Sequence, residues 1–279
     1  QVPVKIPPKA LPGMANIEVT FAPTLVGGLT GAFKVMRDDP LQTWEVRLSR
    51  GVLASDYLRL KPVLGDSVTW PKAPQTIDQM LTDSADFQAP NGGMSFWIPR
   101  NDFVSRYLSV YTALAFDWLG DAGHQPPAQV KRRLWDYLHK EILAKGQDDA
   151  DKYEVLRAGA LAALALAPDG HLPDGAVAGM LPDLHKLRLF GQALLLDAAI
   201  GSHDRTSADA IAKSLLSYAE ESAGEISFNE DEQGAYLDLL ATPLRSNCAI
   251  LDALSRYRTA YGDQNILGDT PQRLMRWVA

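Results

Sequence analysis

Two kinds of helix alternate along this sequence, and the alternation restricts the possible folds more than any other feature. Segments 102–119, 126–145, 204–222 and 243–262 concentrate their apolar residues on one face. Segments 151–167 and 187–200 are apolar almost all round, which is typical of helices buried on every side. We therefore expect two layers, with inner helices beginning near residues 41, 102, 150, 184 and 243.

Layered helices joined as successive hairpins predict an all-α fold. The repeat is irregular and about fifty residues long, and about six such hairpins would close into an α/α toroid. An open α-solenoid is the competing architecture, but its repeats are usually shorter and more regular. The final residues, "DTPQRLMRWVA", begin like a helix and then stop, so we expect the last hairpin to be cut short.

The first 25 residues differ from the rest. "QVPVKIPPKALPG" is proline-rich, and "NIEVTFAP" alternates Ile17, Val19 and Phe21 with polar residues, which is a strand pattern. We interpret residues 1–25 as an extended lead-in from a preceding β-domain and residues 26–279 as the toroid domain. Two glycine-containing stretches, 91–97 and 224–234, predict tight turns followed by short extended pieces.

Charge and hydropathy exclude two classes of partner. The net charge of −7 argues against a nucleic-acid-binding protein, which usually presents a basic surface. The longest apolar run, residues 158–167, is far shorter than the roughly 20 residues needed to cross a bilayer. We expect neither nucleic-acid binding nor a membrane span in this chain.

The stretch "DDPLQTWEVRLSRGVL", residues 38–53, predicts the start of the first inner helix. We expect Asp39 to cap this helix and Pro40 to occupy its first position. A buried stripe would then follow, formed by Leu41, Trp44, Leu48 and Val52. Thr43 and Val46 share a different face, where residues three apart have Cβ atoms about 5–6 Å from each other.

The segment Thr43-Trp44-Glu45-Val46, with the "RLSRGV" that follows, resembles the thioester region of bacterial α2-macroglobulins. That family has the pattern Cys-x-Glu-Gln, in which the Cys thiol condenses with the Gln side-chain amide into a strained thioester. Here the glutamate and the following helix are kept, but Thr43 and Val46 replace the two reacting residues. Further similarity in "IPPKALPGMANIEVTFAPTLVGGLTGAF", "NGGMSFW" and "NCAILDALSRY" extends the resemblance over most of the chain.

The resemblance implies an α/α toroid within a large multidomain protein of the bacterial periplasm. That family traps proteases after bait cleavage, so the implied partners are proteases, neighbouring domains of the same chain and cell-wall-associated periplasmic proteins. Val46 has no side-chain carbonyl, and a threonine hydroxyl is a far weaker nucleophile than a thiolate. We therefore expect a degenerate thioester site, no covalent capture and a non-enzymatic, structural role.

No other group of residues predicts a metal or a cofactor. The five histidines, His124, His139, His171, His185 and His203, have no metal-ligand spacing on a helix face. The one cysteine, Cys248, lies in an apolar helical pattern and is interpreted as a packed core thiol. We expect no catalytic residue, no metal and no cofactor.

The alternative function is that of a carbohydrate-active enzyme, because α/α toroids also host glycoside hydrolases and lyases. Such an enzyme needs a carboxylate pair across an open cavity. Its candidates here are Asp86, Asp102, Glu225, Glu230, Asp231 and Glu232, and Trp97, Trp118 and Trp135 could line a sugar cleft. A structural domain predicts a filled centre instead, which the Leu- and Ala-rich inner helices favour.

Overall fold

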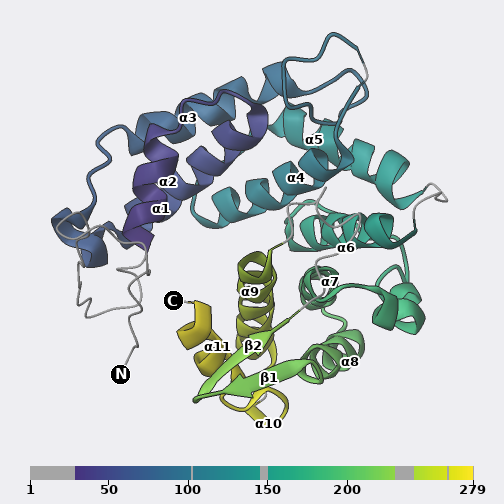
Figure 1. The fold of residues 1–279 in the computed structure, drawn as a ribbon. Coiled ribbons are helices and arrows are strands. Elements are labelled where there is room, and N and C mark those ends of the chain that lie inside the picture. Colours follow the sequence, from purple (N-terminus) through teal and green to yellow (C-terminus); the bar gives the residue numbers. More distant parts are fainter. Residues whose placement is uncertain (1–28, 102, 145–149, 230–241, 263, 279) are drawn as a thin grey trace, which may run out of the picture.

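The computed structural model describes residues 29–101, 103–144, 150–229, 242–262 and 264–278 (Figure 1). The fold is all-α, as predicted, with one small β-hairpin. The helices are α1 (Thr30–Asp38), α2 (Trp44–Leu64), α3 (Ala73–Asp83), α4 (Arg106–Asp121), α5 (Ala128–Tyr137), α6 (Ala150–Leu166), α7 (Leu189–Gly201), α8 (Arg205–Leu216), α9 (Pro243–Tyr261), α10 (Gln264–Leu267) and α11 (Thr270–Val278). The strands are β1 (Ala219–Ser222) and β2 (Glu225–Phe228).

The helices form the two layers that the sequence predicts. The inner helices α2, α4, α6, α7 and α9 each pack on the next, and Figure 1 shows them as an arc. The outer helices α3, α5, α8 and α11 pack on α2, α4, α7 and α9 respectively. Between α6 and α7 a 3₁₀ segment, Ala178–Lys186, packs on α8. Closure of this arc into a toroid stays a prediction.

The all-round apolar segments are buried over most of their length, as predicted. Every residue of α7 from Leu189 to Ile200 is buried, because α6, α8 and α9 all pack against this helix. Helix α6 is buried in the same way from Ala158 to Leu164. These two helices have no solvent-facing stripe, which explains why their sequences have no helical amphipathicity.

The predicted start of α4 is wrong by a few residues. Asp102 lies outside the described residues, and the Asn101 side chain accepts a hydrogen bond from the Phe103 amide instead of capping the helix. Ser105 is the cap, because its hydroxyl accepts from the Leu108 amide at 3.2 Å. Several short polar side chains precede the helix, so local sequence alone does not decide which of them caps it.

The predicted helix 204–222 ends early, at Leu216. Residues 219–222 form β1, which pairs antiparallel with β2 through a turn at Ala223 and Gly224, both with positive φ. A tertiary contact favours the strand: the buried side chain of Asn247 in α9 accepts from the amide of Phe228 and donates to its carbonyl, both at 2.8 Å. Segment 126–145 similarly divides into α5 and a π-helical turn, Leu138–Leu143.

The two predicted turn-and-strand stretches are present as far as the structure describes them. In 91–97, Gly92 has φ 94° and Met94 pairs with Gln88 in an isolated antiparallel bridge. In 224–234, the turn and β2 are seen, and residues 230–234 lie outside the described part of the chain. The lead-in 1–25 lies outside it too. Within the described helices, none combines the length and the apolar character needed to cross a membrane.

Candidate functional site

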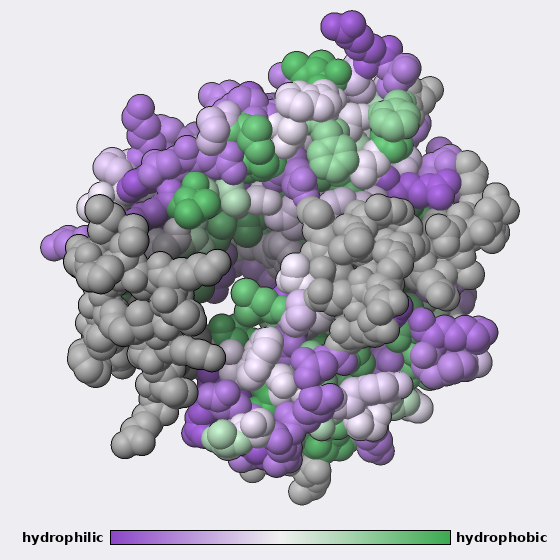
Figure 2. Space-filling view, in the orientation of Figure 1, coloured by the Kyte–Doolittle hydropathy of each residue, from purple (hydrophilic) through white to green (hydrophobic). Residues whose placement is uncertain are grey.

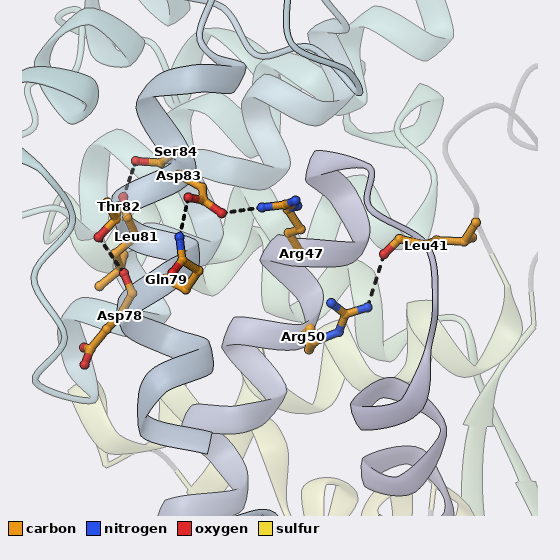
Figure 3. Close-up of polar contacts among 9 residues, drawn as sticks. All are labelled: Leu41, Arg47, Arg50, Asp78, Gln79, Leu81, Thr82, Asp83 and Ser84. Carbon is orange, nitrogen blue, oxygen red and sulfur yellow. Dashed lines mark hydrogen bonds and ion pairs between the residues drawn. The ribbon is translucent and has the colours of Figure 1, made fainter. Parts of the chain in front are cut away.

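Helix α2 begins at Trp44 with Thr43 as its N-cap residue, so the expected cap Asp39 and first-turn Pro40 are wrong. The Asp39 carboxylate instead accepts a hydrogen bond from the Leu41 amide at 2.8 Å, which holds the connection from α1 in a turn. Arg50 fixes the same connection by donating to the Asp39 carbonyl. It also donates to the Leu41 carbonyl, as Figure 3 shows. Leu41 is therefore exposed, and the buried stripe starts at Trp44.

Trp44 is fully buried and joins three distant segments. Its amide donates to the Phe96 carbonyl at 2.9 Å, and its indole Nε1 donates to the Thr112 hydroxyl at 2.8 Å. Its ring stacks on Phe87 with centroids 5.4 Å apart. The tryptophan of the predicted motif thus anchors the head of α2 to α4 and to the loop that precedes it.

The polar residues that follow Trp44 point to two different neighbours. Glu45 is half-buried, and its carboxylate lies 3.4 Å from the Tyr107 hydroxyl of α4. Arg47 faces α3, where it forms an ion pair with Asp83 (Figure 3). Its guanidinium also lies over the ring of Phe87, in the 3₁₀ turn that follows α3. One turn after Glu45, the Ser49 hydroxyl shares a 2.8 Å hydrogen bond with Tyr111. These contacts fix the rotation of α2 about its axis.

Thr43 and Val46 are both half-buried at this fixed helix start. The Thr43 carbonyl accepts the first helical hydrogen bond, from the Arg47 amide at 3.0 Å, while its side chain caps nothing. A hydroxyl and an isopropyl group cannot condense with each other, because neither provides an acyl carbon. That these positions correspond to the reacting pair of a thioester motif stays a prediction.

The face of α2 that starts at Glu45 and Ser49 continues as Val52, Asp56 and Arg59, which line a central cavity of about 460 Å³. The other walls come from α4, α6, α7 and α9, and Figure 2 shows this side of the molecule hollowed at its centre. The predicted filled centre is wrong. The inner helices pack against their neighbours in the arc, but residues of each of them line this cavity.

Four carboxylates line the cavity, and none of them is among the residues predicted from the sequence. They belong to Asp56, Asp121, Asp197 and Asp252. The carboxylates predicted for an enzyme lie elsewhere: Asp86 and Glu225 are exposed on the 3₁₀ turn Ser84–Phe87 and on β2, and Asp102, Glu230, Asp231 and Glu232 are outside the described residues. Asp197 could have been identified from the sequence, because it is a charged residue within the otherwise apolar helix α7.

Three of these carboxylates surround one guanidinium group. Arg256 donates to Asp252 at 3.0 Å, and its nearest approaches to Asp197 and Asp121 are 3.9 and 4.0 Å. Burial raises the pKa of Asp197 well above its usual range, and the nearby charge of Asp252 adds to this shift. Burial likewise raises the pKa of Asp117, one turn before Asp121, to about 8.

Cys248 is not a packed core thiol, so that prediction is wrong. It is exposed on the cavity side of α9, where partial burial raises the pKa of its thiol. In the described parts of the chain, no group of three or more histidine, cysteine and acidic side chains is arranged to hold a metal ion. Of the three tryptophans considered for a cleft, Trp118 lines the cavity, Trp135 is buried and Trp97 is exposed.

Comparison with known proteins gives matches among solved structures alone. No protein-family model matches the chain, and no curated protein sequence matches it. Escherichia coli alpha-2-macroglobulin in its native conformation matches with a TM-score of 0.72 and 18% identity, over 90% of this chain and 15% of that one. A crystal structure of the native E. coli protein from domain MG7 to the C-terminus matches with a TM-score of 0.67 and 19% identity, over 88% and 38%.

Salmonella alpha-2-macroglobulin reacted with methylamine matches with a TM-score of 0.66 and 16% identity, over 90% of this chain and 17% of that one. The chain therefore has the fold of one segment of these bacterial alpha-2-macroglobulins. It spans well under half the length of each of these three chains.

Proposed function

We propose that this chain is the thioester-type helical domain of a bacterial alpha-2-macroglobulin-like protein, in a form that captures nothing covalently. Two independent lines support the proposal. The fold matches those proteins over most of this chain, and the Trp-Glu pair with its following helix resembles their thioester region. The domain would comprise residues 26–279, preceded by the lead-in 1–25.

The observation on which the proposal depends is the chemistry at the start of α2. Thr43 and Val46 stand three residues apart where the resemblance places a cysteine and a glutamine. The surrounding helix start is intact, because Trp44, Arg47 and Arg50 each have their hydrogen-bonded or ionic partners. A domain that keeps this scaffold without a reactive pair fits a structural role, and we infer that it is not an enzyme.

A structural domain needs a surface on which its neighbours can pack, and one end of this molecule offers apolar side chains. Exposed large hydrophobic residues occur before α2, in the loop before α4 and in the first turn of α9, namely Leu41, Trp97, Ile98, Phe103 and Leu244. The loop is tied to the head of α2 by the hydrogen bond from Trp44 to Phe96. We infer that other domains of a longer chain cover this end.

The parent protein would act on proteases in the bacterial periplasm. In the absence of a thioester, it would hold a protease by conformational enclosure and non-covalent contacts after bait cleavage, close to cell-wall-associated proteins. The net charge of −7 and the lack of a membrane-spanning helix in the described residues are compatible with this role. This chain would then transmit or restrain the rearrangement of its neighbours rather than react.

Intact-mass measurement with methylamine tests the proposal, because methylamine opens a thioester and adds its own mass. We expect the natural chain to keep its mass after this treatment. The double variant Thr43→Cys with Val46→Gln should lose the mass of one ammonia as the thioester forms, and then gain that of one methylamine. The single variant Thr43→Cys is the matched control, since it adds a thiol without an acyl donor.

Each outcome is decisive. An adduct on the natural chain would mean that another pair of residues is reactive, and it would overturn the non-covalent role. A double variant that folds, as judged by its circular dichroism, but forms no thioester would show that Thr43 and Val46 do not occupy the reacting positions. The natural chain without an adduct, together with a reactive double variant, supports both parts of the proposal.

A further inference from the structure

The central cavity has the size of a small-molecule site and is bounded by helices on several sides. Its volume of about 460 Å³ lies within the range of roughly 300–1,000 Å³ that is typical of ligand pockets. The inner helices α2, α4, α6, α7 and α9 all contribute to its walls. Figure 2 shows the molecule hollowed at this place, so a small molecule can enter from solvent.

Much of the wall is apolar, and part of it remains accessible. Val110 of α4 and Leu194 of α7 line the cavity and are buried. Val52 of α2, Trp118 of α4 and Leu166 of α6 line it as well, and these three side chains are half-buried. A molecule that covers their remaining surface removes apolar area from water, which is favourable in proportion to that area.

The tyrosine hydroxyls of the wall already have partners. The Tyr111 hydroxyl shares a 2.8 Å hydrogen bond with Ser49, and the Tyr107 hydroxyl lies 3.4 Å from the Glu45 carboxylate. The two tyrosine rings are nearly parallel along α4, with centroids 6.1 Å apart. This wall therefore does not require a polar group from a ligand.

The exposed charges of the lining compensate one another. Arg256 forms an ion pair with Asp252 at 3.0 Å and approaches Asp121 to 4.0 Å. Arg59 likewise approaches Asp56 to 4.0 Å. The side chains of Asp121 and Arg59 are 68% and 64% exposed, so these groups lie where the cavity meets solvent and stay hydrated there.

Two further ionisable residues complete a lining without a charge excess. Burial raises the pKa of Asp197 well above its usual range, which favours the uncharged carboxyl. Arg245 lies over two rings, 4.4 Å from the Phe190 centroid and 5.6 Å from that of Tyr107. With Asp197 uncharged, three carboxylates and three guanidinium groups remain in the lining. An ionic ligand would lose hydration on entering and would meet no net attraction.

We propose that the central cavity binds an uncharged, largely apolar molecule, whose body lies against the side chains of Val52, Trp118 and Leu166 and displaces water from them. The ion pairs of the lining keep their contact with solvent in such a complex. Binding here is non-covalent and does not involve Thr43 or Val46. This proposal and the proposed function therefore succeed or fail independently.

Cys248 makes the proposal testable in the natural chain, because the sole thiol of the protein is exposed and lines the same cavity. The probes are cinnamyl alcohol, cinnamylamine and cinnamate, which share one skeleton and differ in the charge of the head group. We expect the alcohol to slow the modification of Cys248 by a neutral aromatic disulfide and to give a binding isotherm by calorimetry. The amine and the carboxylate should bind at least about tenfold more weakly, because each must lose hydration. Equal or tighter binding of either ion, or no binding of the alcohol up to about 10 mM, would overturn the proposal.

Substitutions that fill the cavity test where the alcohol binds. Val52→Phe places a ring in the space that the ligand needs and should lower the affinity for cinnamyl alcohol by about tenfold or more. The matched control is Val35→Phe, the same change at a side chain of α1 that is 70% exposed and outside the lining. Cys248→Phe is a second filling variant, and its fold, checked by circular dichroism, should be kept because the natural side chain is exposed. Unchanged affinity in both filling variants, or an equal loss in the control, would overturn the proposal.

Discussion

At the scale of single residues, burial has opposite consequences for the hydrogen bonding of Trp44 and Asp117. Trp44 is buried with its one donor satisfied by Thr112 and its ring stacked on Phe87. Asp117 has a buried oxygen, Oδ2, without a hydrogen-bond partner. The first residue stabilises the head of α2, and the second makes the stability of the fold depend on pH.

Replacement of Trp44 by alanine should destabilise the protein by about 3–5 kcal/mol, because it leaves a cavity at the junction of α2, α4 and the preceding loop. Urea-induced unfolding, followed by circular dichroism, measures this change in the free energy of unfolding. Trp97→Ala is the matched control, since Trp97 is 63% exposed, and its effect should stay within about 0.5 kcal/mol. Equal effects of the two changes would contradict the anchoring role of Trp44.

Asp117 should make the protein less stable as the pH rises from about 4 towards about 8. Burial raises the pKa of its carboxyl to about 8 in the folded chain, and the like charge of Asp121 adds to this effect. An unfolded aspartate has a pKa near 3.9. Between these values the folded state holds a proton that the unfolded state has lost, so stability is fully present below the lower pKa and is lost as the pH passes the higher one.

The variant Asp117→Asn removes this dependence. The free energy of unfolding should fall less between pH 5 and pH 8 in the variant than in the natural chain, and the difference between their slopes should not exceed about 1.4 kcal/mol per pH unit. Urea titrations of both proteins at several pH values measure it. Parallel pH profiles would show that Asp117 titrates normally.

At the scale of elements, the contact between α6 and α7 depends on glycine. A Cβ atom on Gly201, the last residue of α7, would lie 2.7 Å from the backbone carbonyl carbon and oxygen of Ala165 in α6. Backbone atoms cannot move aside as a flexible side chain can. The close approach of these two buried helices therefore requires glycine at this position.

We expect Gly201→Ala to destabilise the protein by about 1–3 kcal/mol, the usual cost of overpacking a core. Gly120→Ala in α4 is the matched control, because a Cβ atom there would have no neighbour within 4 Å. That change should be neutral or stabilising by up to about 1 kcal/mol, since alanine favours a helix over glycine. Thermal unfolding of both variants distinguishes the two outcomes, and similar melting temperatures would rule out the tight contact.

At the scale of the whole molecule, the buried apolar residues form one continuous core from Phe33 in α1 to Leu274 in α11. In an array of helical hairpins in which each hairpin contacts only the adjacent ones, different parts of the chain could unfold in separate stages. The continuous core, and the cavity wall to which five helices contribute, favour a single cooperative transition.

The distribution of tryptophans allows a test of this cooperativity. Five of the six lie between residues 44 and 135, so fluorescence reports on the first half of the chain, whereas circular dichroism reports on all of the helices. We expect coincident transitions, and we expect Gly201→Ala, in the second half, to shift the fluorescence midpoint as well. A fluorescence transition that Gly201→Ala leaves unchanged would show that the halves unfold independently.

The sequence by itself determined the layered all-α fold, because helical periodicity and all-round hydrophobicity are local properties that report how many sides of a helix are buried. It also determined that Thr43 and Val46 cannot form a thioester, since that follows from their functional groups. The tertiary structure alone decided where helices begin and end, as at Ser105, and that residues 219–222 pair as a strand with β2, whose Phe228 is held by Asn247. It alone placed Asp197 and Cys248 on a shared cavity, because a cavity is bounded by side chains from helices far apart in sequence, and no local pattern records which of them face one another.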